Sequence, residues 1–131
     1  MSRRILVVDD DPAVRDSIAV VLESAGFLVD QAAQGVTALR LLRVHEPDLI
    51  ITDILMPQKE GIETIREIRL LLPDTPIIAI SGGTEGGADY LKMAQTFGAN
   101  AVMAKPFDPL VMLKLVHRLI FASGASAAAP Q

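Results

Sequence analysis

The sequence predicts an α/β domain in which helices cover both faces of a parallel five-stranded sheet. Short β-branched runs alternate with helical patterns five times along the 131 residues, and this alternation requires crossover connections between parallel strands. The first, third and fourth runs are almost entirely aliphatic, as expected for strands that are covered on both faces. Half of the residues are hydrophobic, which suits one domain with a sizeable core.

The first strand, at residues 5–8, reads Ile-Leu-Val-Val and is followed by a helix start at Asp11-Pro12. A carboxylate before a proline begins a helix well, because it accepts hydrogen bonds from free backbone N–H groups and the ring fits the first helical position. Gly26 is placed to end this helix. The apolar residues of the helix fall on one stripe, namely Val14, Ile18, Val21, Leu22 and Ala25.

The middle of the chain repeats the strand–helix unit twice. The second strand, at residues 28–32, precedes a helix that must stop before Pro47, and the third, at residues 49–52, precedes a helix closed by Pro73. Proline ends these helices because it disfavours helical backbone at the residue before it. Apolar residues define one face of each helix, with Val36, Leu39 and Leu42 in the second and Ile62, Ile65, Ile68 and Leu72 in the third.

Two further units complete the pattern. The fourth strand, at residues 77–80, leads to a weaker helix that ends at Gly98, and the fifth, at residues 101–104, leads to a helix that begins at Asp108-Pro109. The apolar faces of these two helices are Leu91, Ala94 and Phe97, and then Leu110, Leu113, Leu119 and Ile120. Residues 122–131 are small and uncharged, so we expect a flexible Ala/Ser/Gly-rich tail after a domain of residues 1–121.

Composition excludes several classes of protein. The chain has no cysteine, which excludes disulfide frameworks and thiolate metal sites and is compatible with a cytoplasmic location. Its net charge of −4 argues against a nucleic-acid surface, which would be basic. No apolar run approaches the roughly 20 residues of a membrane span, and no signal-peptide pattern follows the start. We therefore expect no contact with nucleic acid or membrane.

Polar side chains stand where four of the five predicted strands end. Asp9 and Asp10 follow the first strand, Asp53 the third, Ser81 the fourth and Lys105 the fifth. In a parallel sheet, functional groups gather beyond the carboxyl ends of the strands. These side chains are therefore expected to converge on one site, whereas the end of the second strand offers little.

The chemistry that this set supports is narrow. Clustered carboxylates without cysteine or a nearby histidine suit a hard cation with oxygen ligands, and Mg²⁺ fits best. A bound cation also removes the repulsion between the aspartates. The amine of Lys105 and the hydroxyl of Ser81 suit an anionic phosphoryl group, and a carboxylate in such a site can act as a nucleophile toward phosphorus. Asp11 is expected to cap the first helix instead.

These residues and their surrounding motifs carry a family resemblance. Asp9-Asp10, Asp53 within "DILMPQKEG", Ser81, and Lys105 within "GANAVMAKPF" together resemble the receiver domain of two-component response regulators. The resemblance covers residues 4 to about 121 and is to stand-alone receivers of the chemotaxis type. It implies a flavodoxin-like, three-layer fold with strand order 2-1-3-4-5.

The resemblance also implies a phosphoacceptor and a metal site. Asp53 would receive a phosphoryl group from a sensor histidine kinase or a histidine phosphotransfer protein. Asp10, Asp53 and the main-chain carbonyl of Leu55 would bind Mg²⁺, with Mn²⁺ as a substitute, and Asp9 would contribute through water. The chain would be a signalling domain rather than an enzyme, although it would assist its own phosphorylation and dephosphorylation.

Further roles follow from the same resemblance. Lys105 would pair with the phosphoryl group and precede a cis Pro106, and Ser81 would be the switch hydroxyl next to a mobile loop at residues 82–87. The phosphodonor would dock on the first helix and the segment after the fifth strand, at Ala13, Val14, Ser17, Pro106 and Phe107. A downstream output protein would read the switch, and the chain would be a monomer or a weak homodimer.

The chain departs from the family pattern at two positions of the fifth strand segment. Val102 stands where the family usually has Tyr or Phe, so the ring that normally moves with the switch hydroxyl is missing. Asn100 stands where an acidic residue is common, which puts in doubt the charged dimer interface of many DNA-binding relatives.

Other functions fit less well. The stretch "SGGTEGG" at residues 81–87 lacks the Gly-Lys-Ser/Thr ending of a phosphate-binding loop. A haloacid-dehalogenase-like phosphatase would need an Asp-x-Asp pattern followed by Thr or Val, and a dinucleotide-binding domain would need a glycine-rich turn after the first strand. Two alternatives remain, namely a receiver-like scaffold that binds partners without phosphorylation, and the receiver part of a longer regulator.

Overall fold

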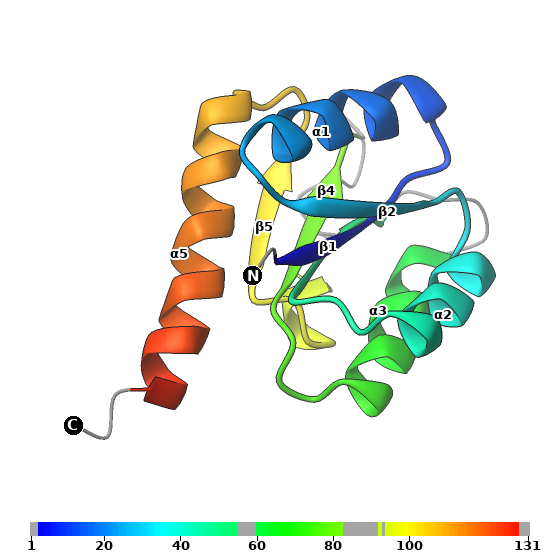
Figure 1. The fold of residues 1–131 in the computed structure, drawn as a ribbon. Coiled ribbons are helices and arrows are strands. Elements are labelled where there is room, and N and C mark those ends of the chain that lie inside the picture. Colours follow the sequence, from blue (N-terminus) through cyan, green and yellow to red (C-terminus); the bar gives the residue numbers. More distant parts are fainter. Residues whose placement is uncertain (1–2, 55–59, 83–91, 93, 129–131) are drawn as a thin grey trace.

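The computed structural model describes residues 3–54, 60–82, 92 and 94–128, and these form a sheet with helices on both faces (Figure 1). The strands are β1 (Arg4–Val8), β2 (Leu28–Ala32), β3 (Leu49–Asp53), β4 (Ile77–Ser81) and β5 (Ala101–Ala104). All pairings are parallel, and the strand order is β2-β1-β3-β4-β5. The predicted flavodoxin-like fold and strand order are confirmed.

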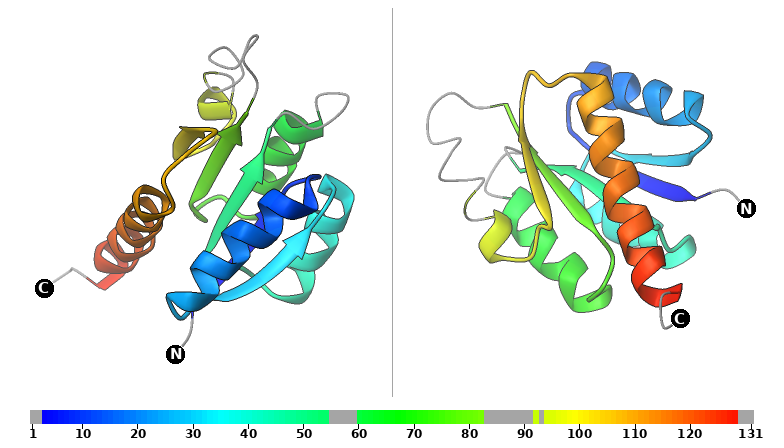
Figure 2. Two further views of the ribbon diagram at one scale, coloured as in Figure 1. Left: turned by 90° about the horizontal axis from the view of Figure 1, so that it is seen from above. Right: turned by 90° about the vertical axis from the view of Figure 1, so that its left-hand side faces the viewer.

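The helices lie in two layers on opposite sides of the sheet. They are α1 (Pro12–Ser24), α2 (Gly35–Val44), α3 (Glu60–Leu71) and α5 (Pro109–Ala128). Helices α1 and α5 pack on one face, and α2 and α3 pack on the other together with a short helical segment at residues 94–96 (Figure 2). Strands β3 and β4 are buried along their whole length. Their aliphatic sequences are therefore explained by the two apolar layers that they separate.

Local signals at the helix ends are confirmed. The Asp11 carboxylate accepts a hydrogen bond from the Ala13 N–H at 2.9 Å, so Asp11 caps α1. At the other end, Gly26 has a φ of 96° and donates to the Glu23 carbonyl at 3.0 Å. A positive φ suits glycine, because in other L residues the Cβ would come too close to the residue's own backbone. Gly98 ends the segment at residues 94–96 in the same way, with a φ of 127°.

Gly61 places the start of α3 directly against the end of β3. A Cβ atom on Gly61 would lie 2.4 Å from the Ile54 Cα, closer than any real contact. Only a residue without a side chain allows this approach. The glycine therefore lets the backbone after β3 pass close to α3, next to the strand end that carries Asp53.

The buried face of α5 differs from the expected stripe. Met112, Val116 and Ile120 are buried, while Leu110 is 65% exposed. In α2, Val36 is likewise exposed, and Ala38 and Leu42 face the core. Apolar residues from 110 to 121 occur on more than one side of the helix, interrupted only by Lys114, His117 and Arg118, so periodicity alone could not select the side of α5 that packs. The contacts of α5 with α1 and the sheet determine which of its sides is buried.

The C-terminal segment also differs from the sequence expectation. Helix α5 continues through residues 122–128, where a flexible tail was expected. Alanine has the highest helix propensity of all residues, and it dominates this stretch, which explains the extension. In the part of the chain that the structure describes, α5 and the other helices all lack the length or the apolar character needed to cross a membrane.

Candidate functional site

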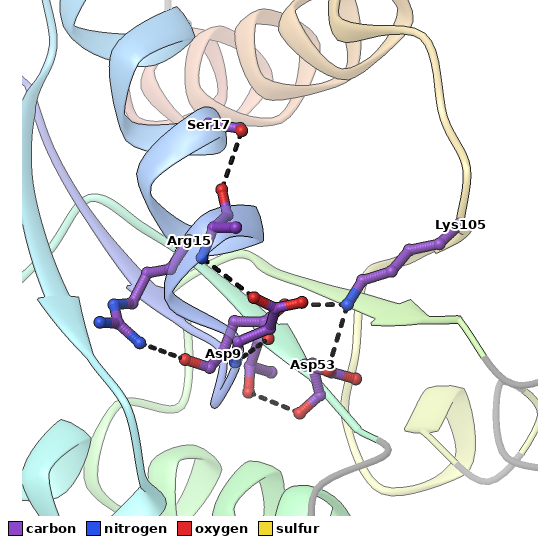
Figure 3. A network of polar contacts seen from close by, with 8 residues as sticks. Asp9, Arg15, Ser17, Asp53 and Lys105 are labelled. Carbon is purple, nitrogen blue, oxygen red and sulfur yellow. Dashed lines mark hydrogen bonds and ion pairs between the residues drawn. The ribbon is translucent and has the colours of Figure 1, made fainter.

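Lys105 lies between two buried carboxylates at the carboxyl ends of the strands. Its Nζ is 2.9 Å from Asp9 Oδ2 and 3.2 Å from Asp53 Oδ2 (Figure 3). Asp9 follows β1, Asp53 is the last residue of β3, and Lys105 follows β5. Both carboxylates are almost fully enclosed, with exposures of 1% and 5%. The parallel sheet thus brings together three of the residues that the sequence singled out.

The charges in this cluster hold Lys105 in its protonated form. Burial alone would lower the pKa of the lysine. The hydrogen bond to Asp9 and the negative charges of Asp53 and Asp9 outweigh burial, so the pKa of Lys105 is raised above its ordinary value. At neutral pH the site therefore contains an ammonium ion that bridges two carboxylates.

The three consecutive aspartates have different surroundings. Asp9 Oδ1 accepts a hydrogen bond from the Asp11 N–H at 2.9 Å, and its Oδ2 faces Lys105. Asp10 is exposed. Asp11 caps α1, so its structural role is confirmed. The triplet therefore provides one buried carboxylate that is already paired, one that is open to solvent, and one that starts a helix.

Three carboxylates converge closely enough to hold a cation. Asp9, Asp10 and Asp53 each offer an oxygen, and these oxygens all lie within 4.8 Å of one another. The donor set contains neither sulfur nor imidazole, which favours a hard cation such as Mg²⁺. The residues present thus fit a magnesium ion. Leu55, whose carbonyl was predicted to be a further ligand, lies outside the described residues.

Ser81 carries a buried hydroxyl beside the ion pairs. It is the last residue of β4 and is 2% exposed. Within the described part of the chain, its Oγ has no hydrogen-bond partner. Leaving a buried polar group unpaired costs about 1–3 kcal/mol. Its main-chain carbonyl accepts from the Lys105 N–H at 2.8 Å, which fixes the ends of β4 and β5 side by side.

Gly82 leaves room for the Lys105 side chain. A Cβ atom at Gly82 would lie 2.9 Å from Lys105 Cδ. The absence of a side chain therefore allows the lysine to extend toward Asp9 and Asp53. The rest of the predicted mobile loop, residues 83–87, lies outside the described residues.

Comparison with known proteins agrees with this fold. The family model for the response regulator receiver domain matches residues 5–117. The chain belongs to this family. Receiver domains are signalling domains of two-component systems, so the class of protein predicted from the sequence is confirmed.

Relatives of this receiver domain include proteins of different lengths. Response regulator Rre1 of Synechocystis is 36% identical over 126 residues, which are 94% of this chain and 54% of Rre1. An uncharacterized 14.6 kDa protein of Leptolyngbya boryana is 36% identical over 118 residues, 90% of each chain. The chain therefore spans about half of Rre1 and nearly all of the shorter relative.

Solved structures also match the receiver fold. A CheY-like receiver domain protein from Methanospirillum hungatei superposes with a TM-score of 0.89 at 28% identity, over 96% of this chain and 99% of that one. The chemotaxis response regulator CheY4 of Vibrio cholerae superposes with a TM-score of 0.80 at 30% identity, over 91% and 99% of the two chains.

An apolar groove opens beside Lys105 on this receiver domain. It has a volume of about 450 Å³ and runs between α1 and the segment from β5 to α5. The residues lining it that were predicted to dock a partner are Val14, Ser17, Pro106 and Phe107. Ala13 is exposed in the first turn of α1 but is not part of the lining. The Lys105–Pro106 peptide is cis, as the family resemblance implied.

Sequence reasoning missed Arg15 and Gln31. The Arg15 Nη1 donates to the main-chain carbonyl of Asp9 at 2.7 Å, and its Nε donates to Gln31 Oε1 at 3.0 Å. Gln31 belongs to β2, the strand whose end was expected to offer little. A basic residue one helical turn after the aspartates was the available signal, but its partner became clear only once β2 was placed beside β1.

The two departures from the family pattern have structural roles. Val102 is half-buried and packs against the core on the side of α2 and α3. The Asn100 side chain accepts from the Ile77 N–H at 2.9 Å and from Arg69 Nη2 at 3.0 Å. Burial lowers the pKa of Arg69. The amide of Asn100 therefore ties the start of β4 to α3.

Proposed function

We propose that this chain is a phosphoacceptor response regulator that receives a phosphoryl group on Asp53. The donor is a sensor histidine kinase or a histidine phosphotransfer protein, and the reaction depends on Mg²⁺. The observation that carries the proposal is the buried Asp53 carboxylate, which pairs with Lys105 and has an oxygen within 4.8 Å of oxygens of Asp9 and Asp10.

In the transfer step, an oxygen of the Asp53 carboxylate attacks phosphorus. The P–N bond of the donor phosphohistidine breaks, and its electron pair returns to the imidazole nitrogen, which then takes up a proton. The product is an acyl phosphate on Asp53. When bound, Mg²⁺ neutralises charge on the phosphoryl oxygens.

Asp10 and Asp53 are the proposed direct ligands of the ion, together with the main-chain carbonyl of Leu55. Asp9 acts through water, because its two oxygens already accept from the Asp11 N–H and from Lys105. Mn²⁺ should substitute for Mg²⁺, since it accepts the same oxygen ligands.

Lys105 and Ser81 are the proposed partners of the phosphoryl group. The ammonium of Lys105 already faces Asp53 at 3.2 Å and would move to a phosphoryl oxygen. The Ser81 hydroxyl, buried and without a partner in the described part of the chain, would gain an acceptor there. We infer that this new bond, with rearrangement of residues 82–87, is the switch that an output protein reads.

The groove beside Lys105 is the proposed docking site of the phosphodonor. Val14, Ser17, Pro106 and Phe107 line it, and the exposed Ala13 precedes Val14 in α1. This position would deliver a donor imidazole to Asp53. We further propose a cytoplasmic location, no binding of nucleic acid, and a monomer or weak homodimer.

Incubation with acetyl phosphate and Mg²⁺, followed by measurement of the intact mass, tests the proposal. The wild-type protein should gain the mass of one phosphoryl group, and Asp53→Asn should gain none. A receiver-like scaffold that binds partners without phosphorylation would leave both masses unchanged.

A further inference from the structure

Arg15 reaches from α1 back to the loop that carries the acidic residues (Figure 3). Its guanidinium makes two hydrogen bonds in different directions. Nη1 donates to the Asp9 carbonyl at 2.7 Å, and Nε donates to Gln31 Oε1 on β2 at 3.0 Å. Arg15 is half-buried. It therefore connects the β1–α1 loop to the neighbouring edge strand of the sheet.

Hydrogen bonds hold both peptide groups that flank Asp9. The Asp9 N–H donates to the Ala32 carbonyl of β2 at 3.1 Å. The Asp9 carbonyl belongs to the peptide that leads to Asp10, and this is the group that Arg15 holds. Rotation of that peptide would turn the Asp10 side chain to a new direction. The orientation of the exposed Asp10 carboxylate thus depends on Arg15 and on its support, Gln31.

Arg15 could affect cation binding in two opposite ways, through its positive charge or through its hydrogen bond to the main chain of Asp9. A guanidinium bonded to the main chain of Asp9 would repel a cation bound by the neighbouring carboxylates, so a residue that acted only through its charge would weaken cation binding. A neutral replacement would then bind the cation more tightly. A residue that orients a ligand has the opposite effect, since loss of a group that holds a metal ligand in place typically lowers metal affinity about 10- to 100-fold.

We infer that Arg15, supported by Gln31, is a positioning residue of the cation site. It holds the Asp9–Asp10 peptide so that the Asp10 carboxylate faces Asp53. The gain in ligand orientation exceeds the repulsion between the guanidinium and the bound cation. This inference rests on the proposed function, because it assumes that Asp9, Asp10 and Asp53 bind Mg²⁺.

Calorimetric titration of the full chain with MgCl₂ tests the inference, with thermal unfolding in the absence of metal as the control for folding. Arg15→Met keeps the aliphatic stem and removes both donors, so it should weaken Mg²⁺ binding about tenfold. Arg15→Lys keeps the charge and one donor, and it should recover part of the loss. Gln31→Ala removes only the acceptor of the Arg15 Nε hydrogen bond, and it should lower the Mg²⁺ affinity less than Arg15→Met does. Arg118→Met, on the exposed side of α5, should leave the affinity unchanged.

Equal or tighter Mg²⁺ binding by Arg15→Met would overturn the inference. Tighter binding would show that Arg15 acts on the cation through its charge, and equal binding would show that Arg15 does not orient a ligand. If Arg15→Met does not fold, Arg15→Lys and Gln31→Ala decide the question, and wild-type affinity in both would also overturn it. A wild-type protein that does not bind Mg²⁺ would refute the proposed function itself, and the inference with it.

Discussion

Lys105 Nζ lies 3.2 Å from Asp53 Oδ2, although the two residues are 52 positions apart in the chain. The contact exists because β3 and β5 run parallel on either side of β4, so that their carboxyl ends meet at one edge of the sheet. The same ammonium also pairs with Asp9. The positive charge of Lys105 therefore balances part of the negative charge of two buried carboxylates at the proposed phosphorylation site.

The raised pKa of Lys105 predicts a change in stability at alkaline pH. The folded protein binds this proton more tightly than the unfolded chain does. The resulting stabilisation is complete below the unfolded-state pKa of about 10.5 and is lost as pH rises through the higher folded-state pKa. Lys105→Met should therefore flatten the fall in stability above that pH, measured by urea unfolding. If Lys114→Met, which changes an exposed lysine of α5, flattens the curve equally, the assignment to Lys105 is wrong.

Removal of the Asp10 charge should raise the melting temperature in the absence of metal and reduce the stabilisation that Mg²⁺ provides. The Asp10 carboxylate is exposed and can bring an oxygen within 4.8 Å of oxygens of Asp9 and Asp53. Repulsion between such charges is about 1 kcal/mol per pair in water. Asp10→Asn should thus melt at a higher temperature than the wild type in the absence of metal, and millimolar Mg²⁺ should stabilise it much less. Asp16→Asn, on the exposed side of α1, is the matched control and should keep the full response to Mg²⁺.

The Ser81 hydroxyl should contribute to stability only when a phosphoryl group is present. Its buried Oγ is unpaired within the described part of the chain, so Ser81→Ala should not destabilise the unmodified protein. A hydrogen bond to a charged group contributes about 1.5–3 kcal/mol. Beryllofluoride, which mimics a phosphoryl group, should accordingly stabilise the wild type more than Ser81→Ala by about this amount, and Ser81→Thr should retain the gain. Equal stabilisation of wild type and Ser81→Ala in urea titrations would exclude Ser81 as the switch hydroxyl.

Two glycine-to-alanine substitutions in helices should affect the stability of the protein differently. A Cβ at Gly61 would lie 2.4 Å from the Ile54 backbone, so Gly61→Ala should destabilise the protein by about 1–3 kcal/mol through overpacking. Gly124 lies in α5, where alanine is favoured over glycine by about 0.5–1 kcal/mol. Gly124→Ala should therefore be neutral or stabilising in chemical denaturation. A stabilising Gly61→Ala would mean that α3 does not approach β3 this closely.

The sequence predicts the strands and the converging side chains well because both follow from local patterns and one rule of parallel sheets. Aliphatic runs identify β1, β3 and β4, and the sheet then brings Asp9, Asp53 and Lys105 to the same edge. The Asp11 cap is predictable for a similar reason, since it depends on its own helix alone.

Contacts that depend on the placement of neighbouring elements could not be predicted in this way. The bond between Arg15 and Gln31 requires β2 to lie beside β1 and the arginine to extend across the loop between them. The exposure of Leu110 depends on how α5 is rotated against α1 and the sheet. The lack of a partner for Ser81 Oγ among the described residues depends on the side chains around it, which no spacing in the sequence specifies.

Locating the modified residue after treatment with acetyl phosphate and Mg²⁺ is the most direct test of the account. Borohydride reduces the acyl phosphate of an aspartate to homoserine, so peptide mapping identifies the residue that carried the phosphoryl group. We predict homoserine at position 53 in the wild type and no conversion in Asp53→Asn. Homoserine at Asp9, Asp10 or Asp11 instead, or equal conversion in Asp53→Asn, would contradict the assignment of Asp53 as the phosphoacceptor.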